Sequence, residues 1–271
     1  MTVSMPGAEP RGHYRAVHVA RAELAKIASL RSTAITLGTT VVAALVVTTL
    51  VAHSQLHQFP PGFANGFDPT ATALSGMIVV ALTSGVFGAL LITNEYSSGT
   101  IRATLAATPK RPMVFATKAV VTAAMMLAFC EALSFACFFL GQAILSGGGA
   151  PSAGLASPGA ARAVVMTGAF VTLLCLMSLA FGFVFRSTAA AIAAFVGVVF
   201  VLPLVMHGIS RTAVPYLPTT ILANSIMVTV RQAPPGAPGA PLSPTVGLVL
   251  MVVYAAVALL AGAAVFFKRD A

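Results

Sequence analysis

Long runs of apolar residues are the feature that most constrains this chain. A helix needs about 20 consecutive, mostly apolar residues to cross the hydrocarbon core of a bilayer, and six segments meet that requirement. The predicted spans are residues 35–52, 72–93, 113–145, 163–184, 188–206 and 245–267. The third is long enough to tilt or to extend past the bilayer. We therefore expect an all-α integral membrane protein with six transmembrane helices.

The scarcity of charged residues supports this expectation. Only 8% of the 271 residues are Asp, Glu, Lys or Arg, whereas a soluble domain carries about 25%. A chain with so few charges cannot cover its surface in water, so the lipid bilayer is its expected surroundings. The net charge of +9 does not indicate a nucleic-acid partner, because the basic residues flank the apolar runs instead of forming a stripe with stacking aromatic rings.

The positions of lysine and arginine predict the orientation, because cytoplasmic loops carry an excess of these residues. With the N-terminus in the cytoplasm, twelve basic residues fall inside and three outside. The inside set is Arg11, Arg15, Arg21, Lys26, Arg31, Arg102, Lys110, Arg111, Lys118, Arg186, Lys268 and Arg269, and the outside set is Arg162, Arg211 and Arg231. We expect a multi-pass protein with both termini in the cytoplasm.

The chain divides into residues 1–34, a cytoplasmic N-terminal segment, and residues 35–271, the six-helix transmembrane domain. Within the first, Tyr14–Arg31 is predicted to form an amphipathic helix on the membrane surface. Its apolar positions are Val17, Ala20, Leu24 and Ile27, and its basic positions are Arg15, His18 and Lys26. The alternative is a solvated linker beside the membrane.

Residues 94–112 are the only sizeable cytoplasmic loop between predicted spans. Gly99 permits a sharp turn, Thr100 is a residue type that caps a following helix, and that helix should stop before Pro109. Ile101 and Leu105 lie one turn apart on a shared face. A short helix of this kind can dock on a soluble partner, and the alternative is an ordinary loop.

The residues of this loop resemble a known signature. The run Glu95-Tyr96-x-x-Gly99-Thr100-Ile101-Arg102-x-Thr104-Leu105, followed by Thr108-Pro109-Lys110-Arg111, is similar to the cytoplasmic motif of type-2 permeases of ATP-binding-cassette (ABC) transporters. Residues 21–33 resemble the amphipathic helix that precedes the first span in that family, although Leu24 stands where members often have tryptophan. Tyr216-Leu217-Pro218 resembles a family motif before the last span.

The resemblance implies a bacterial exporter of the inner (cytoplasmic) membrane. Two permease subunits, identical or homologous, would form its membrane domain, and a separate ABC ATPase subunit would bind ATP and Mg²⁺. The residues implied to couple the permease to the ATPase are Glu95, Tyr96, Gly99, Thr100, Ile101, Arg102 and Leu105. Glu95 would pair with a basic or polar group near the ATPase contact or on the N-terminal helix. Ile101 and Leu105 would fill the docking groove.

Motifs for energy conversion or catalysis are absent from the sequence. It contains no G-x-x-x-x-G-K-[ST] phosphate loop and no G-x-S-x-G or H-E-x-x-H motif, so we expect a non-enzymatic chain with no cofactor of its own. His53 and His57 stand four residues apart without a glutamate base between them, and we assign them no metal. Cys130, Cys137 and Cys175 lie inside apolar runs and are interpreted as packing residues.

Glu131 is the only carboxylate that the predicted spans place within the membrane. A charge at that depth costs about 2.5–3.5 kcal/mol on insertion scales, so Glu131 either lines a substrate cavity or bonds to a neighbouring helix. Ser84 and Gly88 belong to a face of small residues that serves either the cavity or close helix packing. A self-contained secondary transporter or channel is the alternative function, but such proteins usually carry several ion-handling groups at mid-depth. The sequence does not indicate the substrate.

Overall fold

The computed structural model describes residues 16–29, 31–56, 67–107, 110–228 and 239–268, without the side chains of residues 16, 17, 28 and 29. The described elements are helical: α1 (Ala16–Ser29), α2 (Arg31–Leu56), α3 (Pro69–Ala73), α4 (Met77–Ser97), α5 (Thr100–Ala107), α6 (Arg111–Gly147), α7 (Ala160–Phe185), α8 (Thr188–Val196), the π-helical turn η1 (Gly197–Val201), α9 (Leu202–Ile209), the 3₁₀ turn η2 (Val214–Tyr216), α10 (Pro218–Ile226) and α11 (Pro244–Lys268). Six stretches of this described part are long and apolar enough to cross a membrane. The six predicted spans are confirmed, and the chain is a multi-pass membrane protein.

The second span differs most from its predicted bounds of 72–93. Its first residues belong to α3, which is separate and begins where the Asp68 carboxylate accepts a hydrogen bond from the backbone N–H of Ala71. At its other end, α4 continues to Ser97 and so contains Glu95. The polar residues from Asn94 onward do not end the helix, because the Glu95 carboxylate finds cationic partners inside the protein.

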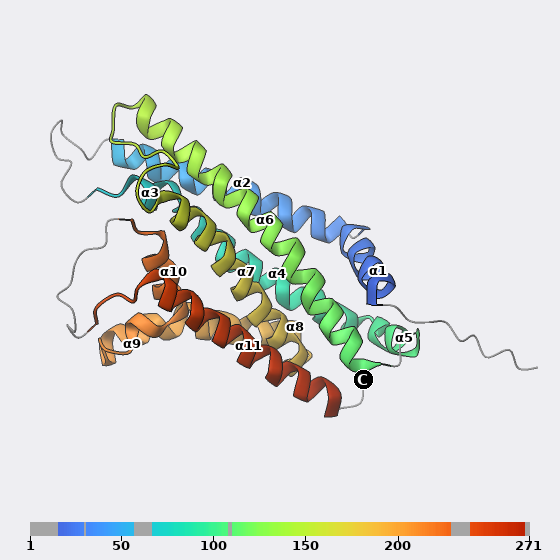
Figure 1. Ribbon diagram of the computed structural model, residues 1–271. Coiled ribbons are helices and arrows are strands. Elements are labelled where there is room, and N and C mark those ends of the chain that lie inside the picture. Colours follow the sequence, from blue (N-terminus) through green and yellow to red (C-terminus); the bar gives the residue numbers. More distant parts are fainter. Residues whose placement is uncertain (1–15, 30, 57–66, 108–109, 229–238, 269–271) are drawn as a thin grey trace, which may run out of the picture.

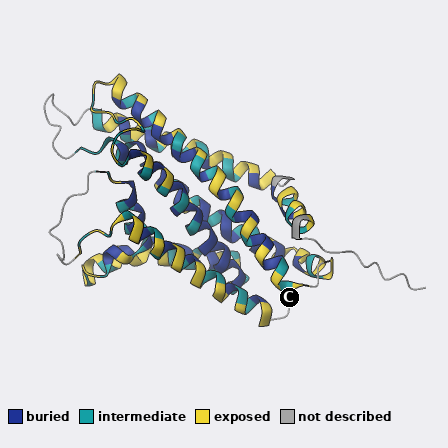
Figure 2. Cartoon of the chain, viewed as in Figure 1, coloured by how far each residue is buried: buried dark blue, intermediate teal, exposed yellow. Residues whose placement is uncertain are grey.

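The spans alternate in direction along one bundle axis (Figure 1). At one end lie α1, α5 and the C-terminal end of α11, and we call this the α5 end. At the other lie α3 and α10, and we call this the α10 end. The central helix is α7, which packs against α4, α6, α8, α10 and α11. Figure 2 shows the buried residues concentrated on the inner helices of the bundle.

Helices α4 and α7 approach each other closely because α4 offers small residues at the contact. A Cβ atom on Gly88 would overlap the backbone carbonyl of Cys175, so the helices could not lie this close with any larger residue there. Ser178 of α7 donates a hydrogen bond to the Gly85 carbonyl at 2.5 Å. All three cysteines are reduced and buried, as expected of packing residues.

The fifth span is a continuous helical stretch whose middle turn, η1, is a π-helix. Pro203, two residues after η1, has no N–H to give to the carbonyl of Val199, four residues earlier. The hydroxyl of Thr219, in α10, donates to that carbonyl instead. This cross-helix bond explains how a proline is accommodated within an apolar span and ties α10 to the fifth span.

The outer faces of the bundle are apolar. In α2 and α11 most of the span lies outside the protein core, and Leu50 and Leu260 are among the exposed side chains there. An exposed apolar face that runs along a whole span is suited to contact with lipid. Between the fifth and sixth spans the chain forms η2 and α10. Residues 229–238, which follow α10, and His57 lie outside the described residues.

Candidate functional site

The segment that connects α4 to α6 forms a turn and a short helix at the α5 end. Gly99 adopts a positive φ of 71°, which glycine reaches without steric cost, and α5 begins at the next residue. The Thr100 hydroxyl lies 3.0 Å from the Ser98 hydroxyl. No described backbone N–H of α5 donates to it, so the predicted cap by Thr100 is wrong.

The inner face of α5 packs on the bundle. Ile101 is only 2% exposed, and Leu105 packs beside it. Their neighbours in this hydrophobic cluster come from four spans and include Ile92 of α4 and Phe115 of α6. The expectation that Ile101 fills a groove on a partner is therefore corrected: its side chain fills the core of its own chain.

Aromatic rings continue this cluster into α7 and α11. The ring centroids of Phe115 and Phe183 are 4.7 Å apart, and those of Phe183 and Phe266 are 5.2 Å apart. Such spacings are typical of favourable aromatic contacts. The inner face of α5 thus rests on a rigid layer shared by α4, α6, α7 and α11.

The outer face of α5 is exposed and small. Its exposed residues, with those of the preceding turn, are Ser97, Ser98, Gly99, Thr100, Arg102, Ala103, Ala106 and Ala107. Arg102 contributes the only charge among these residues. A surface with short side chains and one arginine is open to close approach by another protein, and arginine is enriched in protein interfaces.

Tyr96 links the end of α4 to the turn between α7 and α8. The guanidinium carbon of Arg186 lies 5.1 Å from the centroid of the Tyr96 ring, a cation–π contact. Arg186 holds a left-handed backbone conformation, with φ of 54°, where it ends α7. Tyr96 is therefore half-buried against its own chain.

Four charged residues form a connected network beneath this segment. Lys118 Nζ lies 2.7 Å from Glu23 Oε2 and 2.7 Å from Glu95 Oε1. Lys26 Nζ lies 2.6 Å from the same oxygen of Glu95. We call Glu23, Lys26, Glu95 and Lys118 the Lys118 network. Because two carboxylates face two ammonium groups, its formal charges balance, and it joins α1, α4 and α6.

Lys118 is the centre of the network and is 3% exposed. Lysine is almost never fully buried unless it is paired, because removing its charge from water costs several kcal/mol. Two short charge-assisted bonds compensate for that cost here. Removing either partner alone would leave a buried charge, so the three helices are held in one relative arrangement.

Comparison with protein families places these features in context. Residues 40–271 match the family described as "Protein of unknown function (DUF2705)". The chain belongs to this family. The matched range contains Glu95, α5 and Lys118 of this DUF2705 member, whereas Glu23 and Lys26 precede it. No curated protein matches the chain.

The structure contains the pairing expected for Glu95 in this DUF2705 member, and it adds two residues that sequence reasoning missed. Glu95 does bond to the N-terminal helix, through Lys26. Lys118, however, was assigned to the cytoplasmic flank, and Glu23 had no role. One signal was available: Lys118 lies inside the predicted span 113–145, where an unpaired ammonium is not tolerated. Glu95 also lies within a span, so Glu131 is not the only carboxylate there.

The N-terminal helix presents a different face from the predicted one. Glu23 and Ile27 are buried and Leu24 is 49% exposed, although Leu24 and Ile27 were assigned to one apolar face. The reason is that Glu23 reaches Lys118, which turns the Glu23 side of α1 toward α6. Leu24 is consequently left exposed on the outer side of α1.

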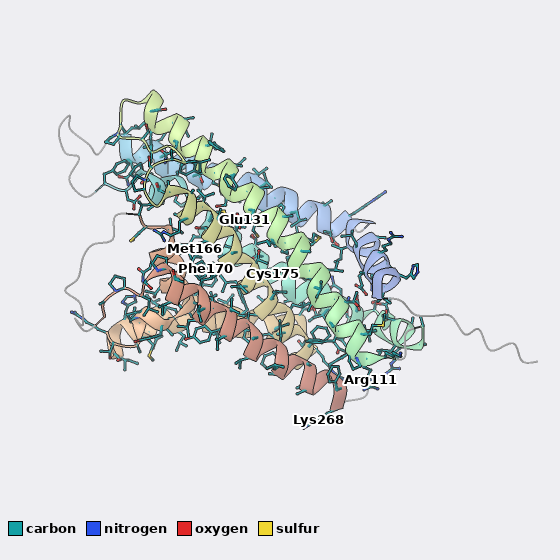
Figure 3. The ribbon with its side chains drawn as sticks, in the orientation of Figure 1. Arg111, Glu131, Met166, Phe170, Cys175 and Lys268 are labelled. Atoms are coloured by element: carbon teal, nitrogen blue, oxygen red, sulfur yellow. The ribbon has the colours of Figure 1, made fainter. Side chains whose placement is uncertain are left out.

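Two of the residues expected to line a substrate cavity, Ser84 and Gly88, are buried inside this chain. Ser84 is buried, and its hydroxyl bonds to the carbonyl of Ala81 within α4, while Gly88 is covered by α7. The close approach of Gly88 to the Cys175 backbone is the helix packing considered for this face, and the cavity role stays a prediction. Glu131 lies between the two ends of the bundle (Figure 3), with its carboxyl against Gly168 of α7.

The Tyr216-Leu217-Pro218 motif forms a corner at the α10 end. Tyr216 ends η2, and Pro218 is the first residue of α10, a position that suits proline because it needs no N–H there. The hydroxyl of Tyr254, in α11, donates to the Tyr216 carbonyl at 2.9 Å. The motif thus positions the last span relative to α10.

Proposed function

We propose that this chain is the membrane-spanning permease subunit of an ABC exporter, with ATP hydrolysed on a separate ATPase subunit. One observation carries the proposal: α5 exposes one face while its other face is built into the layer that joins four spans. The family description names no activity, so the proposal rests on this geometry together with the resemblance of residues 95–111 to the ABC permease motif.

The geometry supports transmission of a movement from outside the bundle to its helices. A partner that displaces α5 pushes on Ile101, which is held by Ile92 and Phe115. The Lys118 network links the adjoining ends of α4 and α6 to α1. Packed interiors respond to such displacement by shifting between discrete arrangements and not by gradual deformation. Coupling in this proposal therefore uses Arg102 and Ala103 as contact residues and Ile101 as the internal support.

The charge distribution supports a cytoplasmic location for the α5 end. Of the eleven lysines and arginines in the described part of the chain, nine lie at this end and two, Arg162 and Arg211, lie at the α10 end. Figure 3 shows two of the nine, Arg111 and Lys268, near each other there. Such an asymmetry is typical of cytoplasmic ends. In this orientation α5 faces a soluble ATPase, and α1 lies at the membrane surface as an interfacial helix.

The exposed apolar faces of α2 and α11 are suited to a second permease subunit as well as to lipid. A complete transport pathway in this proposal forms between two subunits, identical or homologous.

A photo-crosslinking experiment tests the proposal. A photoreactive amino acid placed at Ala103, on the outer face of α5, is expected to capture a protein that carries the G-x-x-x-x-G-K-[ST] phosphate loop. The matched control is Ala143, an exposed alanine near the far end of α6, which should capture no such protein. Capture at Ala103 of proteins without a phosphate loop only, or no capture at all, would refute the proposal.

One observation favours a secondary transporter as the second candidate function. The Lys118 network supplies buried ionisable groups that the sequence interpretation lacked, and groups of this kind handle protons in transporters. Under this alternative, the purified chain in liposomes moves protons when a pH gradient is imposed, and Lys118→Met abolishes the movement. A pH-sensitive dye inside the liposomes measures it, and a silent wild-type chain excludes the alternative.

A further inference from the structure

A partly open cavity of about 310 Å³ lies beside the Lys118 network. It is lined by α1, the first turns of α2, the second half of α4, the start of α5 and the first half of α6. Its apolar wall includes Ile27, Phe87, Leu90 and Leu91, and its polar wall includes Glu95 and Thr122. A volume of about 300 Å³ is at the lower end of the range for small-molecule sites. The cavity's other lining residues are polar or charged, and an apolar wall on which polar groups converge is also typical of such sites.

Two polar atoms of the cavity lining lack a protein partner. Glu95 is 4% exposed and Thr122 is 0% exposed. Among the described residues, neither Glu95 Oε2 nor Thr122 Oγ1 has a hydrogen-bond partner. Buried polar atoms of native proteins are rarely left unpaired. These two belong to residues that line the same cavity, which indicates that something inside it bonds to them.

The electrostatics of the lining indicate the charge of the occupant. Glu23 and Glu95 are balanced by Lys26 and Lys118, and Glu95 Oε1 already accepts from both ammonium groups. An anion in the cavity would be repelled by the buried Glu95 carboxylate, and a cation would be repelled by the ammonium groups of Lys26 and Lys118. A neutral donor meets neither, and it satisfies the free carboxylate oxygen.

We propose that this cavity binds a small neutral amphiphile. Its hydroxyl or amide head donates a hydrogen bond to Glu95 Oε2 and exchanges one with the Thr122 hydroxyl, while its apolar body lies along Phe87, Leu90 and Leu91. The site does not depend on an ATPase partner, so it stands or falls separately from the proposed transport function. An occupant there contacts α1, α4 and α6 at once and stabilises their present arrangement.

The test uses the full chain in nanodiscs and a decanol that carries a diazirine on its alkyl chain. Photolysis followed by peptide mass spectrometry is expected to place label on α4 between Phe87 and Leu91. Labelling should saturate, and unlabelled decanol should compete at least about tenfold better than decanoate or decylammonium, which have charged heads.

Two variants separate the cavity from non-specific partitioning into lipid. Thr122→Val keeps the shape of the side chain and removes only the unpartnered hydroxyl, so folding is unaffected while labelling of α4 falls about threefold to tenfold. Leu90→Trp fills the cavity and should abolish the labelling of α4. The control Thr39→Val, on the exposed side of α2, should leave labelling unchanged.

The proposal is overturned if labelling of α4 does not saturate, if the charged probes compete as well as decanol, or if Thr122→Val has no effect. Those results would show that the cavity holds water only. Size-exclusion chromatography of each variant confirms that the chain compared is folded.

Discussion

Replacement of Lys118 by methionine is the most informative perturbation of this structure. Methionine matches the length of the lysine stem but carries no charge. It leaves Glu23 without its ion-pair partner and leaves Glu95 with Lys26 alone. Breaking a buried ion pair by removal of one partner costs about 3–5 kcal/mol. We therefore expect Lys118→Met to lower the free energy of unfolding by about that amount.

A double variant isolates the cause. In Glu23→Gln with Lys118→Met, the remaining Glu95–Lys26 pair is balanced, and at most an unpaired neutral amide is buried, which costs about 1–3 kcal/mol. The double variant should accordingly be more stable than Lys118→Met alone by about 2 kcal/mol. A stabilising second substitution of this kind is evidence for charge imbalance and not for loss of packing.

The measurement is reversible unfolding in mixed micelles. The chain contains no tryptophan, so far-UV circular dichroism follows the helices, and a thiol-reactive fluorogenic dye reports exposure of the buried cysteines. The matched control is Lys110→Met, since Lys110 is exposed at the start of α6 and should change stability by less than about 0.5 kcal/mol. If Lys118→Met costs no more than this control, or if the double variant is no more stable than the single one, the network does not hold the helices as described.

Three further predictions concern packing and the turn. Gly99→Ala should cost about 1 kcal/mol through backbone strain alone, because no atom lies near the added carbon, and Gly99→Asn should cost less because asparagine tolerates positive φ; unfolding titrations compare the two. Gly88→Ala should abolish recovery of folded protein in size-exclusion chromatography, because the α7 backbone occupies the space of the new side chain. Its control, Gly38→Ala, meets open space and should leave stability unchanged or raise it by up to about 1 kcal/mol. Ile101→Ala should cost about 2–5 kcal/mol and Leu24→Ala less than about 0.5 kcal/mol; equal costs in unfolding titrations would contradict the assigned burial of α5.

The sequence by itself determined the six spans and the turn at Gly99. Hydrophobicity over about 20 residues is a local property of the chain, so the spans follow from the order of residues without knowledge of their neighbours. The turn is equally local, since it depends on the backbone freedom of one glycine. Helix ends were less well predicted, and α4 runs on to Ser97, because a polar residue ends a span only if it finds no partner inside the protein.

Only the tertiary structure decided which side chains meet. Glu23 and Lys118 are 95 residues apart in sequence, and nothing local in either segment indicates that they form an ion pair. The same holds for Ile101, whose exposure depends on whether α5 turns toward the bundle or away from it. Hydrophobic periodicity defines the faces of a helix, but contacts with residues distant in sequence decide which face packs against the rest of the protein. In α1, the ion pair between Glu23 and Lys118 turns the Glu23 side inward, and the neighbouring Leu24 is left exposed.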